Sequence, residues 1–195
     1  MSYQKKLGSV FKKATFASLL SMLSCSLFAD TKQNAEIYIK EGTAIIDMVN
    51  TGSINLAEVE SKVLLLLQQA VPLAYAYGDA HPNGKQYLQV VIDEAAKESG
   101  KGNVTALGPM VDQTFDHLEV FWHDAGFAEV KDIGIDMSDE DNEHFNDPMH
   151  AIVHPVMVLR AARDYSSNND PNALAAMKSE MEEGIEQVQL LINEL

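Results

Sequence analysis

Histidine is concentrated in one part of the chain, and its imidazole is a common ligand of transition metals. Five of the six histidines fall within 38 residues: His117, His123, His144, His150 and His154. His150 and His154 are four residues apart, so on a helix both rings lie on one face and can reach a common ion. The same face continues through Met157 and Ala161, which places the histidine pair toward a protein interior.

The ligand set suggested by this spacing is built from nitrogen and oxygen. Two imidazoles without a competing cysteine suit zinc, copper or nickel, and a nearby Met149 or Met157 would favour copper. A crossing of two helices could add His123 or His117, with Glu119 or Asp147 orienting a ring, and His144 is a further candidate. The sequence therefore predicts a metal site drawn from these five histidines. Its affinity should fall as the pH drops through about 6.5, the usual pKa of histidine.

Two other interpretations of the histidines stay open. They could be packed core residues, with their ring nitrogens satisfied by carbonyls or by carboxylates of a neighbouring helix. Alternatively, His150 or His154 could hold a non-covalent haem together with a distant methionine such as Met48. The acidic segment 139–150 does not fit an EF-hand, since His144 stands where the calcium loop needs glycine.

Catalytic motifs are missing from the sequence. It contains no H-E-x-x-H, G-x-S-x-G, Walker or G-x-G-x-x-G pattern. The two Asp-x-x-His pairs, at Asp141 and Asp147, are crowded into one region and do not form the set that a di-iron bundle needs. We therefore expect a binding protein and not an enzyme.

The first 29 residues differ from the rest of the chain and resemble a secretory signal peptide. Four lysines precede an apolar run over residues 14–23, and no acidic residue occurs before Asp30. The run is about half the ~20 residues that a membrane span needs, so no transmembrane span is expected. We expect residues 1–29 to be removed and 30–195 to form one domain, secreted or periplasmic. Lipidation at Cys25 is the alternative way of processing this segment.

The charge of the chain restricts its partners. The 195 residues include 14 basic and 29 acidic side chains, for a net charge of −15. Without the four lysines of the leader, 10 basic residues stand against 29 acidic ones, which gives about −19. Such a field repels nucleic acid and attracts cations or a basic protein partner. No cysteine remains after Cys25, so disulfides and thiolate ligands are excluded from the mature chain.

Apolar residues recur at steps of three and four along most of the chain, which is the pattern of amphipathic helices. Pro72 should kink or end the second helix early, Asn55 and Glu58 should cap its start, and Pro155 should disturb the fifth. The predicted helices are one around Tyr38 to Val49, a second from Leu56 to about Ala70, a third over about 84–98, a fourth over about 103–125, a fifth from the Asp147-Pro148 cap to about Tyr165, and a last one from Asp170-Pro171. Strand signals are scarce, so we predict an all-α, up-and-down bundle of five or six helices.

The working hypothesis is an exported, acidic helical bundle that binds zinc or copper as a carrier, buffer or sensor. Its main rival is a cell-envelope scaffold protein of the same fold, which would bind a basic partner through its acidic surface. A haem protein is the third possibility.

Overall fold

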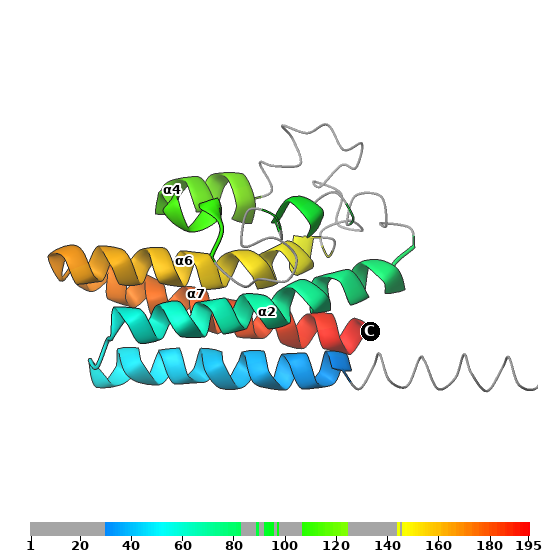
Figure 1. Ribbon diagram of the computed structural model, residues 1–195, viewed down its shortest axis with the longest axis horizontal. Coiled ribbons are helices and arrows are strands. Elements are labelled where there is room, and N and C mark those ends of the chain that lie inside the picture. Colours follow the sequence, from blue (N-terminus) through cyan, green and yellow to red (C-terminus); the bar gives the residue numbers. More distant parts are fainter. Residues whose placement is uncertain are drawn as a thin grey trace, which may run out of the picture.

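Four long helices form the body of the protein. The computed structural model describes residues 30–82, 89, 92–95, 97, 107–124, 144 and 146–195, and this part of the chain contains helices and turns but no strand. The long helices cover residues 30–51, α2 (Leu56–Ala80), α6 (Asp147–Asn168) and α7 (Pro171–Glu194). Figure 1 shows them lying alongside one another. The predicted fold class, an all-α helical bundle, is confirmed.

Helix α6 is the central element of the bundle. It packs most extensively on α7 and α2, and the shorter elements η1 (Pro109–Asp112), α4 (Phe115–His117) and η2 (Leu118–His123) also contact it. Figure 1 shows α4 above α6, on the side away from the N-terminal helix. Every residue of α6 from 151 to 159 is buried. A polar side chain in this stretch must therefore find its partners inside the protein.

The helix starts follow the expected capping chemistry in two of three cases. The side chain of Asn55 accepts a hydrogen bond from the backbone of Glu58 at 3.2 Å, and Asp170 caps α7 through the backbone of Asn172 at 2.9 Å. The predicted cap of α6 is wrong by one residue, because Asn146 occupies the cap position and its side chain does not cap the helix. That side chain instead donates to the carbonyl oxygen of His123 at 3.1 Å.

Neither interior proline ends its helix. Helix α2 continues past Pro72 to Ala80, so the expectation of an early end is wrong. The cost of a helical proline is about 3 kcal/mol, and burial of Leu73 and Tyr77 beyond it offsets that cost, since each buried large apolar side chain contributes about 1.5–3 kcal/mol.

At Pro155 a hydroxyl group replaces the missing helix donor. Proline has no N–H, so the carbonyl of Ala151 loses its partner four residues on. The hydroxyl of Tyr38, in the helix over 30–51, donates to this oxygen at 3.0 Å. Tyr38 is fully buried, and burial raises the pKa of its hydroxyl, so the group remains a donor. This bond lets α6 continue to Asn168, past the predicted end near Tyr165.

The predicted fourth helix is not continuous in the described residues. Residues 107 and 108 are not helical, η1 is a 3-10 turn, and a new start follows at α4, where Thr114 accepts from the backbone of His117 at 3.2 Å. The physical reason is Pro109, which restricts Gly108 and cannot donate to a preceding turn.

Several predictions fall wholly or partly outside the described residues. Of the predicted third helix, residues 89, 92–95 and 97 are described, and all are helical. The predicted signal peptide over 1–29 lies outside, as do residues 125–143, which include the start of the acidic segment 139–150. Among the helices that are described, none is long and apolar enough to cross a membrane.

Candidate metal centre

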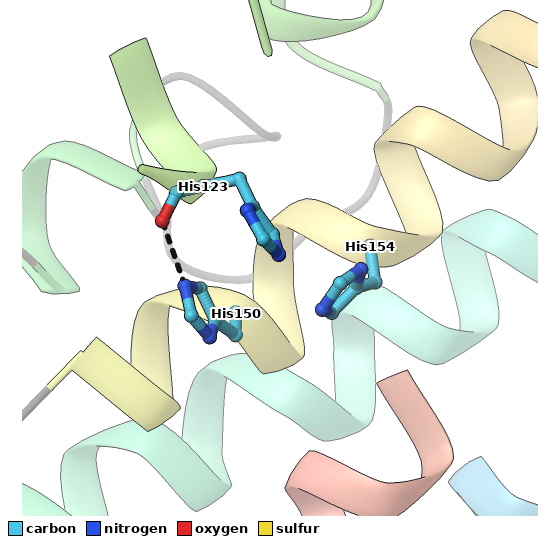
Figure 2. A group of neighbouring side chains, drawn as sticks. All are labelled: His123, His150 and His154. Carbon is cyan, nitrogen blue, oxygen red and sulfur yellow. Dashed lines mark hydrogen bonds between the residues drawn. The ribbon is translucent and has the colours of Figure 1, made fainter. Parts of the chain in front are cut away.

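Three of the five candidate histidines come together where η2 meets α6. His150 and His154 lie one turn apart on α6, and His123 is the last residue of η2. Figure 2 shows the three rings facing one another. One nitrogen from each ring forms a group whose members all lie within 4.8 Å of one another. The ring centroids are 4.5 Å apart for His123 and His150, 5.1 Å for His123 and His154, and 5.6 Å for His150 and His154.

Element η2 is a π-helix, which brings His123 to the surface of α6. Its wider turn is closed by a bond of 2.8 Å from the backbone N–H of Asp124 to the carbonyl of Glu119. Trp122 is buried, and its indole N–H donates to Gln113 at 3.0 Å. Single π turns are rare and are frequently found at functional sites.

His154 has one nitrogen with a partner and one without. Its Nδ1 lies 3.0 Å from a carboxylate oxygen of Glu180 on α7, and both residues are buried. The neutral ring donates its Nδ1–H to the carboxylate, which leaves a lone pair on Nε2. This Nε2 is buried and has no hydrogen-bond partner among the residues that the structure describes.

His150 shows the same asymmetry with the nitrogens exchanged. Its Nε2 lies 2.8 Å from the carbonyl oxygen of His123, which can only accept, so Nε2 carries the proton. The amide nitrogen of Asn146 lies 2.8 Å from the same Nε2 and donates to the His123 carbonyl at 3.1 Å; the ring would accept from Asn146 only in the opposite tautomer. Within the described part of the chain, Nδ1 of His150 is buried and without a partner.

His123 completes the pattern at the solvent side of the group. Its Nδ1 lies 3.2 Å from Asp124 Oδ1 and 3.9 Å from Glu119 Oε1. Nδ1–H therefore donates to Asp124, and Nε2 is the nitrogen left for another ligand. The His123 side chain is 24% exposed, whereas that of His154 is 1% exposed, so the group opens to solvent beside His123.

Burial keeps the two α6 rings neutral. It lowers the pKa of His150 to about 4 and that of His154 to about 4, and in His154 the nearby His123 lowers it further. Burial also raises the pKa of Glu180. Both lone pairs are therefore available at neutral pH. For these two rings, protons should therefore compete with an ion near pH 4, below the 6.5 expected from free histidine.

The other two predicted histidines lie elsewhere. His117 is exposed and stacks on Phe121 at 5.0 Å between ring centroids. The ring of His144 is 6.1 Å from that of His81, and its carbonyl accepts from Tyr77 at 3.4 Å. Neither belongs to the group of three.

Of the other residues predicted to bind the ion or to orient a ring, some lie beside the three histidines and others do not. Glu119 is beside His123, as expected of an orienting carboxylate. The two methionines considered as copper ligands, Met149 and Met157, are both buried in α6. Asp147 is the first residue of α6 and is not a member of the metal-ligating groups found among the described residues.

Glu180 and Gly184 are parts of this centre that sequence reasoning missed. Glu180 lies three residues after Met177 and four before Gly184, and all three are buried on one face of α7. The sequence signal that could have identified Glu180 was a carboxylate on the otherwise apolar face of a helix. A Cβ on Gly184 would lie 2.8 Å from the Tyr38 hydroxyl and 3.0 Å from Cβ of His154, so only glycine allows α7 to approach this closely.

Two neighbouring groups extend the histidine cluster with carboxylates. Glu119, His123 and Asp124 form one, and His154, Glu180 and Glu183 form the other. The protein thus contains side-chain clusters that could hold a metal ion. Comparisons of the chain with protein-family models, curated proteins and solved structures give no match.

Proposed function

We propose that this protein binds a divalent transition-metal ion, zinc or copper, through His123, His150 and His154. Two observations carry the proposal: each ring has one nitrogen beside a hydrogen-bond acceptor, and one nitrogen of each ring lies within 4.8 Å of one nitrogen of both other rings. Metal-ligating histidines almost always donate their second N–H to a carboxylate or a carbonyl, which fixes the tautomer and the ring orientation. The acceptors here are Asp124, the His123 carbonyl and Glu180.

The unpartnered nitrogens argue against simple packing of the histidines. A buried polar atom without a partner costs about 1–3 kcal/mol, and here there are two, on His150 and His154. A histidine that served only to fill the core would be expected to satisfy both nitrogens or to be replaced by an apolar residue. An ion between the rings removes both penalties at once.

The donor set supports zinc or copper over haem. Three neutral imidazoles suit both ions, and copper binds more tightly at a given nitrogen site. Haem would need space for its plane around an axial nitrogen. The other two ligand nitrogens lie within 4.8 Å of that position, so the macrocycle would have to displace them.

We further propose that the protein is exported and acts as a carrier, buffer or sensor of the ion. The basic and apolar leader supports export, and the charge of about −19 in the remaining chain supports attraction of cations. The interaction-scaffold hypothesis would use the same acidic surface without metal.

The test is the metal-dependent gain in stability, measured by thermal melts with chelator and with added zinc or copper. At a hundredfold excess over the dissociation constant the ion should stabilise the fold by about 2.7 kcal/mol. His154→Ala and His150→Ala should lose this gain, whereas His117→Ala, a matched control on an exposed ring, should keep it. Both α6 variants lose stability without metal because the rings are buried, so the metal-dependent gain is the deciding quantity. Its absence in the unsubstituted protein would refute metal binding.

A further inference from the structure

Two carboxylates beside His123 form a cluster on the solvent side of the three rings. The ligand atoms of Glu119, His123 and Asp124 all lie within 4.8 Å of one another. The side chains of Glu119 and Asp124 are 41% and 58% exposed. In the described part of the chain neither carboxylate forms an ion pair with lysine or arginine, and the ion pairs that they make are with His123.

His123 belongs to this outer group and also to the inner group of three rings. Its Nδ1 faces the two carboxylates, and its Nε2 is the nitrogen left for the ion held with His150 and His154. A neutral imidazole has one lone pair, so the ring can serve one group at a time. The two groups are therefore adjacent positions for one ion, filled in turn.

Burial and charge favour movement of the ion from the outer group to the inner group. The inner nitrogens of His150 and His154 are buried and unpartnered, so an ion gains most by reaching them. Burial raises the pKa of Glu119, and the charges of Glu180, Asp124 and Glu183 raise it further, while His123 lowers it. Such a concentration of negative charge next to a partly exposed ring raises the local concentration of cations.

The third group, containing His154, Glu180 and Glu183, does not offer an equivalent route. The His154 side chain is 1% exposed, and its Nδ1 already donates to Glu180, whose side chain is 12% exposed. An ion reaching it from that side would have to break a buried hydrogen bond. The side of His123 is open by comparison.

We propose that Glu119, His123 and Asp124 form an outer cation site that captures the divalent ion from solvent and passes it to the inner site of His123, His150 and His154. The inference rests on the proposed function, because it assumes that the inner site binds an ion. It adds a second site and a route.

The chain provides its own reporter for the test. Trp122 is the only tryptophan and is adjacent to His123, so bound Cu²⁺ should quench its fluorescence. Stopped-flow mixing with Cu²⁺ then gives the association and dissociation rate constants. The variant to compare is Glu119→Gln with Asp124→Asn. A matched control, Glu36→Gln with Asp47→Asn, removes the same charge from two exposed positions on the helix over 30–51.

If the outer site is an intermediate on the route, the paired carboxylate variant should lower the association rate constant by about tenfold, in addition to any faster dissociation caused by losing the Asp124 carboxylate that orients His123. The control should change both rate constants by no more than about twofold, since distant exposed charges are screened. An unchanged association rate, or a fall equal to that of the control, would overturn the proposal. A weaker equilibrium constant caused only by faster dissociation would also overturn it, because the carboxylates would then merely orient His123.

A second measurement observes the outer site directly. In the His150→Ala, His154→Ala double variant the ion should stop at the outer site and give weak, saturable quenching of Trp122. Adding Glu119→Gln and Asp124→Asn should abolish that signal, and residual quenching that survives would count against the site. Failure of the proposed function gives a different result, which is no saturable quenching in the unsubstituted protein or tight binding that persists without His150 and His154.

Discussion

Acidification should destabilise the metal-free protein well above the pH at which its carboxylates would normally begin to be protonated. His150 and His154 are neutral in the folded state, with pKa values of about 4, whereas in the unfolded chain they titrate near 6.5. Between these limits the unfolded state binds more protons than the folded state. The free energy of unfolding must therefore fall as the pH drops from about 6.5 to about 4.

The magnitude follows from the same two values. Each ring differs by about 2.5 pKa units between the two states, and one unit corresponds to 1.36 kcal/mol, so each contributes a loss of about 3 kcal/mol. Glu180 acts in the opposite direction, since its raised pKa lets the folded state take up a proton before the unfolded state does. The two rings together give a slope of up to about 3 kcal/mol per pH unit, and Glu180 reduces it.

Urea unfolding followed by circular dichroism, in the presence of chelator and at steps from pH 7 to pH 5, measures this slope. His154→Gln should reduce the slope of unfolding free energy against pH by up to the contribution of one proton, although the variant is less stable at every pH. His117→Gln should leave the slope unchanged. A free energy of unfolding that is the same at pH 7 and pH 5 would refute the assignment of buried, neutral rings. So would a slope that His154→Gln does not alter.

Other substitutions test separate parts of the structure. Tyr38→Phe should lower the free energy of unfolding by about 1–3 kcal/mol in urea titrations, because it leaves the Ala151 carbonyl buried without a donor. Glu180→Gln should weaken zinc binding in calorimetric titrations by about 10–100-fold, through loss of the carboxylate that orients the inner ring. Met181→Ala should cost about 2–5 kcal/mol in the same urea assay, since this side chain is fully buried in α7. The intact mass of the exported protein should place its N-terminus close to Asp30, and a mass that includes the leader lysines would contradict processing.

The sequence predicted the long helices well because their signals are local. The Asp170-Pro171 start of α7 combines a cap with a first-turn proline, and both act within one turn of chain. The fourth helix was predicted as continuous because its apolar spacing continues across Gly108 and Pro109. Backbone restriction at this proline outweighs the periodicity of the side chains.

In the candidate site, too, the residues set by local spacing were predictable from the sequence, and those set by tertiary packing were not. The pair at His150 and His154 follows from helical spacing alone, and the sequence placed it correctly on one face. The choice between His117 and His123 depends on the π turn of η2, which shifts the register in a way that no spacing rule indicates. Glu180 reaches His154 from another helix, so its role depends on how α7 packs.

The bond from Tyr38 to the carbonyl of Ala151 ties the histidine-bearing turn of α6 to the N-terminal helix. Linkage between the two is reciprocal: whatever holds the rings in place also holds the first helix against the bundle. Amide hydrogens around Tyr38 should therefore exchange more slowly when the ion is bound, although the ion contacts nothing in that helix. Cleavage that removes residues 30–40 should in turn reduce metal affinity. The first segment of the folded chain would then report on the state of a site formed by residues 123–154.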